Sequence, residues 1–131
     1  MSKLTGVTPN LITNDIDRAT AFYRDVLGFT VTTTVPDAEP FVFVWLQRDG
    51  VSIFLNDEKT AKHEAPDATN FVAGQSGVGI FVHIEGVAAL WDDVKDRAHV
   101  VMPLKDQWYG MTEFSITDPD GYILTFAERR E

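Results

Sequence analysis

The chain has 131 residues, of which 44% are hydrophobic and 24% are charged, a balance that excludes disordered and fibrous proteins. Twenty acidic residues against eleven basic ones give a net charge of −9, which disfavours nucleic acid and anionic membranes as partners and favours neutral or cationic ones. The absence of cysteine excludes disulfides, thiolate metal sites and cysteine nucleophiles. Because no apolar leader or membrane-length apolar stretch is present, we expect a cytoplasmic protein.

The first half of the chain predicts a strand, a helix and three further strands. After a strand at 10–13, apolar residues from Ile16 to Leu27 follow helical spacing, and Gly28 supplies a helix stop. The later strands are expected at 29–35, 41–47 and 51–56. The polar stretch that follows contains Pro66, Gly74 and Gly77, and we expect it to be a long connecting loop, 57–78.

The second half repeats this order of elements. A helix is indicated by the spacing of Val87, Leu90, Trp91, Val94 and Ala98. Strands are expected at 99–104, 112–117 and 122–127. The last two are joined by Asp-Pro-Asp-Gly at 118–121, a strong hairpin turn with proline and glycine at positions that suit them.

A comparison of the chain with itself at a shift of 71 residues supports an internal repeat. Asp49-Gly50 falls on Asp120-Gly121, and Ile16, Tyr23 and Phe29 fall on Val87, Val94 and Val100. We therefore expect a single domain of 1–131, built from two fused units at about 8–56 and 79–127.

Two motifs resemble the vicinal oxygen chelate superfamily, which includes glyoxalase I, extradiol dioxygenases and bleomycin resistance proteins. They are Phe-Tyr-Arg-Asp-Val-Leu-Gly-Phe at 22–29 and the late Asp-Pro-Asp-Gly. The opening nine residues and the segment 108–114 are most similar to bleomycin resistance proteins. This resemblance implies an α+β fold in which two βαβββ repeats form a concave mixed-sheet cleft. It also implies a homodimer that exchanges N-terminal strands near Pro9.

The resemblance also identifies four positions that hold metal ligands in the metal-dependent members. Here these positions are occupied by Thr8, Phe54, Gly79 and Thr125. Divalent metals in such sites need imidazole or carboxylate donors, which none of these residues offers. We therefore expect no metal and no other cofactor.

Alternation along the strands predicts the residues that line the cleft. The predicted ligand-binding residues on the strands are Phe54, Phe81, His83, Glu113, Asn10 and Phe43. Trp108 and Tyr109 are predicted to bind ligand because they lie in a loop at the cleft rim, where the alternative is a dimer contact. The strand around Phe43 is ambiguous because both of its faces are apolar. The repeat favours a core position for Phe43 and Trp45, whereas a shift of one residue would place both, with Phe41, in the cleft.

The leading hypothesis is a metal-free protein that sequesters a bleomycin-type or other flat aromatic antibiotic and so confers resistance, with no catalytic residue. The alternative is an enzyme of the same superfamily, a lyase, isomerase or oxygenase acting on a small metabolite. It would require a non-standard metal site, or acid–base work by His83 and Glu113. A third possibility is a family member that binds another ligand and has no role in resistance, since a fold does not fix a function.

Overall fold

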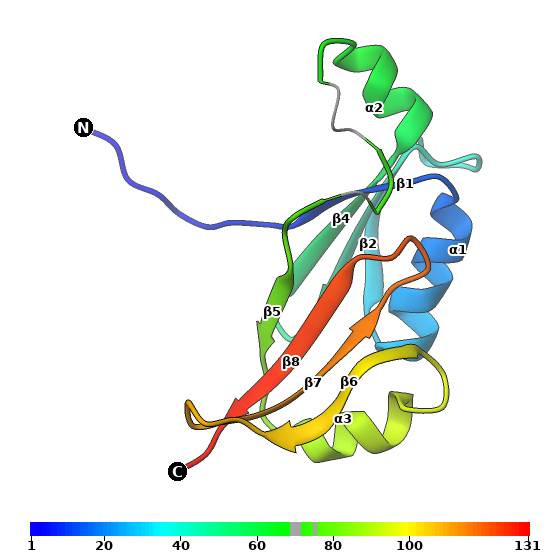
Figure 1. The fold of residues 1–131 in the computed structure, drawn as a ribbon. Coiled ribbons are helices and arrows are strands. Elements are labelled where there is room, and N and C mark those ends of the chain that lie inside the picture. The colour runs from blue at the N-terminus through cyan, green and yellow to red at the C-terminus, as the bar shows by residue number, and fades with distance from the viewer. Residues whose placement is uncertain (69–71, 75) are drawn as a thin grey trace.

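The computed structural model describes residues 1–68, 72–74 and 76–131 and consists of two βαβββ units (Figure 1). Each unit forms a four-stranded sheet, ordered β1-β4-β3-β2 in the first and β5-β8-β7-β6 in the second. In both sheets the first strand of the unit is parallel to the last strand, and the remaining neighbours are antiparallel. The predicted α+β fold of two repeats is confirmed.

The first unit follows the predicted order closely. Its elements are β1 (Asn10–Thr13), α1 (Ile16–Ala21), a π-helical turn η1 (Phe22–Val26), β2 (Thr30–Val35), β3 (Phe43–Arg48) and β4 (Val51–Asp57). Helix α1 begins at Asp15, whose side chain accepts a hydrogen bond from the Arg18 amide at 3.1 Å. The helical segment ends before Gly28, which has a φ of 75° that glycine adopts without strain.

The second unit has the same succession of elements. They are β5 (Ile80–His83), α3 (Val87–Val94), β6 (His99–Asp106), β7 (Met111–Thr117) and β8 (Ile123–Arg129). No helix within the described residues is long and apolar enough to cross a membrane.

The sequence predicted that residues 57–78 form a connecting loop, but part of this connection is a helix. Helix α2 (Glu58–Glu64) begins directly after β4, because the Asp57 side chain accepts hydrogen bonds from both the amide and the hydroxyl of Thr60. None of its residues is buried, and an ion pair between Glu58 and Lys62 supports it. The sequence did not predict α2 because its residues lack the apolar spacing from which α1 and α3 were predicted.

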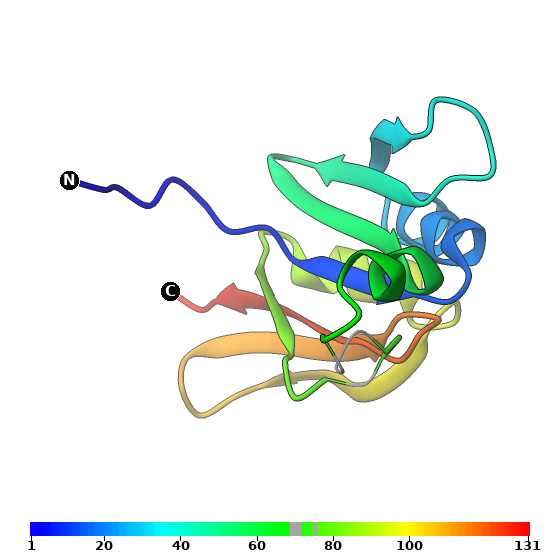
Figure 2. The ribbon, with the colours of Figure 1, turned by 90° about the horizontal axis from the view of Figure 1, so that it is seen from above.

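The two units share one hydrophobic core, in which α1 and α3 lie between the two sheets (Figure 2). Each sheet therefore has an inner face, directed to the helices, and an outer face. The inner faces carry alternate strand residues that are almost fully buried: Val44, Leu46, Ile53 and Leu55 in the first sheet, and Phe114, Ile116, Leu124 and Phe126 in the second. It follows that the two outer faces point away from each other, on opposite sides of the shared core.

Buried hydrogen bonds join the two units. The Tyr23 hydroxyl in η1 donates to Oδ2 of Asp118 at 2.7 Å, across 95 positions of sequence. The Tyr122 hydroxyl donates to the Ile12 carbonyl at 2.8 Å. Burial raises the pKa of Tyr23 well above its ordinary value, and the neighbouring Asp118 carboxylate raises it further. Burial also raises the pKa of Asp118, although the hydrogen bond from Tyr23 opposes that shift.

The repeat does not keep a single shift of 71 residues. Strand pairing makes Ile53 equivalent to Leu124, but Leu46 equivalent to Ile116 and Val31 equivalent to Val100, which are shifts of 71, 70 and 69. The extra turn η1 lengthens the first unit before β2, and the second β-hairpin has one more residue in its turn than the first. The expected match of Phe29 with Val100 was therefore wrong, because Val31 occupies that place.

Candidate functional site

The outer face of the first sheet, here called face A, carries an aromatic cluster. Its residues are Asn10, Ile12, Phe43, Trp45, Ser52, Phe54 and Asn56. The Phe54 ring lies edge-on between Phe43 and Trp45, with centroid distances of 5.1 and 5.4 Å. Trp45 Nε1 donates to Ser52 Oγ at 3.0 Å. Because all three rings are only partly buried, face A can receive a flat apolar group.

The position of Phe43 and Trp45 settles the ambiguity left by the sequence. They lie on the outer face with Phe54, not in the core, and Phe41 instead packs against the edge of the core. The reason is the tight turn between β3 and β4, in which Asp49 and Gly50 both have positive φ, 50° and 82°. The corresponding turn of the second unit is one residue longer. An alignment of the two repeats at a single shift of 71 residues, without a gap, therefore assigns β3 to the wrong face of the sheet.

The outer face of the second sheet, here called face B, is polar in its centre and aromatic at its edge. Its residues are Phe81, His83, Glu113, Ser115, Thr125 and Ala127. Phe81 is exposed on the edge strand β5, where its ring lies 5.2 Å from that of His83. The hydroxyls of Ser115 and Thr125 are hydrogen-bonded to each other at 2.7 Å. Face B therefore offers hydrogen-bonding groups where face A offers rings.

The loop between β6 and β7 presents two further aromatic side chains. Trp108 is 92% exposed, and its ring meets that of Tyr109 edge-on at 5.3 Å. Arg130 holds this loop in place, because its guanidinium donates to the carbonyls of both Gln107 and Met111, at 2.9 and 2.6 Å. An exposed tryptophan on a braced loop is typical of a binding surface.

Glu113 is a buried acidic residue of face B and is 4% exposed. The Tyr109 hydroxyl donates to Oε1 of Glu113. This hydrogen bond raises the pKa of Tyr109, since it stabilises the protonated phenol. Oε2 of Glu113 is buried and accepts no hydrogen bond from any residue that the structure describes.

The predicted ligand-binding residues thus fall into two groups within one chain. Asn10, Phe43 and Phe54 lie together on face A, where the Asn56 amide donates to Asn10 Oδ1. The other five, which lie on face B or its rim, are Phe81, His83, Trp108, Tyr109 and Glu113. Because the two faces lie on opposite sides of the core, a single chain does not bring the groups together. Sequence reasoning omitted Trp45 from the site, although the short Asp-Gly turn that places it could have been recognised.

The four metal-ligand positions of metal-dependent relatives do not suit a metal in this chain. Phe54 is held between two rings, and the Thr125 hydroxyl is already bonded to Ser115. Thr8 and Gly79 precede β1 and β5 and add no nitrogen or carboxylate donor. Within the described residues, no three histidine or acidic side chains are grouped as metal ligands would be. We therefore derive no metal-dependent step.

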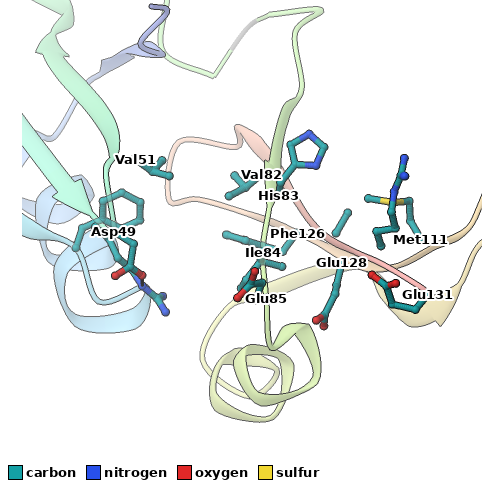
Figure 3. A pocket seen from close by; sticks show the side chains of 14 residues that line it. Asp49, Val51, Val82, His83, Ile84, Glu85, Met111, Phe126, Glu128 and Glu131 are labelled. Carbon is teal, nitrogen blue, oxygen red and sulfur yellow. Dashed lines mark hydrogen bonds and ion pairs between the residues drawn. The ribbon is translucent and has the colours of Figure 1, made fainter.

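A groove of about 960 Å³ runs along the edge strand β5, between the two units (Figure 3). The turn that contains Asp49 and Val51 lies on one side of this groove, opposite His83 and Glu85. Its charged lining residues are four acids and two arginines: Asp49, Glu85, Glu128, Glu131, Arg48 and Arg129. The groove is thus bordered by the unpaired edge of β5 and carries an excess of negative charge.

Comparison with known proteins identifies the family. A bleomycin resistance protein from Geobacillus stearothermophilus is 28% identical over 129 aligned residues, which cover 92% of this chain and 94% of the relative. A solved glyoxalase/bleomycin resistance protein/dioxygenase from Nocardioides has a TM-score of 0.78 at 19% identity and covers 100% of this chain and 87% of that one. TnmS3, an antibiotic binding protein from Streptomyces sp. CB03234, has a TM-score of 0.76 at 17% identity and covers 98% of both chains.

At such low identity the two solved structures establish the fold alone. The family model described as the Glyoxalase/Bleomycin resistance protein/Dioxygenase superfamily, however, matches residues 6–126, which is nearly the whole chain. Taken with the two βαβββ units and their strand order, this match shows that the protein belongs to that superfamily.

Proposed function

We propose that this protein binds a flat aromatic small molecule, such as a bleomycin-type antibiotic, and sequesters it in the cytoplasm without converting it. The observation that carries the proposal is the placement of the aromatic side chains. Face A exposes a cluster of rings, and the rim of face B exposes Trp108. Relatives support this ligand class, since one is a bleomycin resistance protein and another structure of this fold is an antibiotic binding protein.

The binding cleft is formed by two copies of the chain, with face A of one copy opposite face B of the other. This arrangement supplies rings on both sides of a flat ligand, Phe43 and Phe54 from one copy and Trp108 from its partner. Each aromatic contact contributes about 1 kcal/mol beyond the burial of apolar area. A two-fold axis relates the copies, and the dimer therefore has two such clefts.

The N-terminal segment joins the two copies. Residues 1–8 extend away from both sheets and are exposed, including Leu4 and Val7 (Figure 1). The unpaired edge of β5 provides backbone groups to which an extended segment can add as a further strand. Lys3 and the amino terminus complement the excess negative charge of the neighbouring groove. The segment leaves its own chain near Pro9, whose carbonyl accepts a hydrogen bond from the Phe54 amide at 2.9 Å.

A mixing experiment tests the shared cleft. Phe54→Ala and Trp108→Ala chains each form dimers in which both clefts have lost one aromatic side chain. Each variant alone should therefore bind a bleomycin weakly. When the two variants are unfolded together and refolded as a mixture, half of the dimers contain one chain of each kind, and about one quarter of all clefts become intact.

In isothermal titration calorimetry with a bleomycin, we expect high-affinity sites equal to about one quarter of all clefts in the mixed sample. A mixture refolded from two samples of the same variant is the matched control and should recover none. No recovery in the mixed sample, while the wild-type dimer binds, would place the site within one chain. No binding by the wild-type protein would remove the bleomycin-type ligand.

A further inference from the structure

The carboxylate of Glu113 is an unbalanced charge within face B. An acidic side chain that is 4% exposed ordinarily has a cation or several hydrogen-bond donors beside it, because removing a charge from water costs several kcal/mol. Here one neutral hydroxyl, that of Tyr109, is the sole partner of Oε1 among the described residues, and Oε2 has none. The group therefore lacks a donor that carries positive charge.

The protein's own cations do not supply one. Lys105 lies directly opposite Glu113 in the β6–β7 ladder. However, it is exposed, and no ion pair within 4 Å joins it to Glu113 in the part of the chain that the structure describes. The nearby Arg130 is engaged with the loop carbonyls and with Asp106. Among the described residues, no cation of the chain is therefore paired with Glu113, which leaves its carboxylate available to a positive charge on a ligand.

The surroundings of Glu113 fit a small cationic group attached to a ring. Ala127 lies opposite Glu113 on β8, and His83 lies opposite Ala127 on β5, so all three side chains share one row of face B. Two strand spacings separate the Glu113 and His83 backbones, which is about 10 Å. Ala127 has the smallest side chain of this row and is itself buried, so a ligand group would reach Glu113 from the side of Tyr109. On the other side of Glu113, Tyr109 and Trp108 provide ring surfaces.

We infer that Glu113 selects ligands that carry a protonated amine or amidine beside an aromatic ring, and that Tyr109 covers the carboxylate until such a ligand binds. The inference rests on the proposed function of the same cleft. An N–H cation forms short, charge-assisted hydrogen bonds with a carboxylate, which are about twice as strong as neutral ones. A hard metal ion would need several oxygen ligands, and the neighbouring Ser115 and Thr125 hydroxyls are bonded to each other.

Two probes of the same shape test the selection. 2-Naphthylmethylammonium and 2-naphthylmethanol share one ring system and differ in charge. We expect the wild-type protein to bind the cation about 10-fold more tightly than the alcohol, measured by quenching of Trp108 fluorescence and by shifts of the backbone amide signals around Glu113. Glu113→Gln keeps the size of the side chain and should abolish the preference by weakening cation binding alone.

The matched control is Glu64→Gln, which removes the same charge from an exposed position on α2 and should preserve the preference. Tyr109→Phe removes the covering hydroxyl and should strengthen cation binding without changing alcohol binding. Since Tyr109 is exposed, this variant tests the inference even if Glu113→Gln does not fold.

The outcomes separate the two proposals. Equal binding of both probes by the wild-type protein, or an unchanged preference in folded Glu113→Gln, would overturn the role of Glu113 and leave aromatic binding intact. Weaker cation binding by Tyr109→Phe would overturn the covering role of Tyr109. Failure of both probes to bind at millimolar concentration would overturn the proposed function and the selection with it.

Discussion

Face A and face B arise from equivalent positions of the two repeats, yet their chemistry is opposite. Phe43, Trp45 and Phe54 of the first unit correspond to Glu113, Ser115 and Thr125 of the second, by strand pairing. The edge strands are mixed, because polar Asn10 corresponds to Phe81 and apolar Ile12 corresponds to His83. The contrast between the faces therefore lies in their centres, which are aromatic in face A and polar in face B.

The inner faces show no such divergence. Each inner position pairs one apolar residue with another: Val44 with Phe114, Leu46 with Ile116, Ile53 with Leu124, and Leu55 with Phe126. Packing around the shared core requires apolar side chains in both repeats, but it places no such demand on the outer faces. The contrast supports the proposal that the two outer faces form different halves of one binding surface.

Removing residues 1–8, which we propose to join the two copies, should have the largest effect on the pairing of the two faces. A chain without residues 1–8 should be monomeric and should lose binding of a bleomycin, because face A and face B then remain apart. Its far-ultraviolet circular dichroism should be unchanged, since these residues are exposed and lie outside the core. Light scattering after size-exclusion chromatography measures the mass. A dimer that still binds would show that the segment does not join the copies.

Neighbouring residues of β4 sharpen the contrast between inner and outer faces. Leu55 is 1% exposed on the inner face, and Leu55→Ala should lower the free energy of unfolding by about 2–5 kcal/mol through the cavity it leaves. Phe54 points to the outer face, and Phe54→Ala should cost about 1 kcal/mol through lost ring contacts. Urea unfolding of both variants measures these values. An equal loss in both would mean that Phe54 belongs to the core.

The hydrogen bond between the units provides the third and smallest comparison. The repeat aligns Tyr23 with Val94, and both are fully buried, but Tyr23 alone carries a hydroxyl. Tyr23→Phe removes the donor to Asp118 and should cost about 1.5–3 kcal/mol of unfolding free energy, because the acceptor is an acidic group that stays buried. Thr30→Val, which removes a hydroxyl from an exposed position of β2, is the control and should change it by less than about 0.5 kcal/mol. A similar value for both would mean that the Tyr23 hydroxyl does not stabilise the junction.

Most of the fold could be predicted from the sequence because its signals are local. Apolar spacing identified α1 and α3, and Asp-Pro-Asp-Gly identified the last hairpin. The exposed helix α2 was missed because none of its residues is buried and no apolar stripe therefore marks it. The face of β3 could not be predicted because both of its faces are apolar. Its assignment depended on the length of the following turn, which differs by one residue between the two repeats.

The site was harder to predict, because strand alternation determines which residues share a face but not how two sheets are oriented. Phe54 and Thr125 were correctly recognised as equivalent outer residues. Their location on opposite sides of the chain, however, depends on the helices lying between the sheets (Figure 2). That arrangement follows from tertiary packing, as do the burial of Glu113 and its missing partner.

Under the proposed shared cleft, the opposed orientation of the two outer faces also links ligand binding to the abundance of the protein. If each cleft exists only where two copies meet, dilution that separates the copies also releases the ligand, and the ligand in turn stabilises the pair. Apparent affinity would then rise with expression level before it reaches a plateau. A small increase in the concentration of this chain would then raise the number of assembled binding clefts more than proportionally.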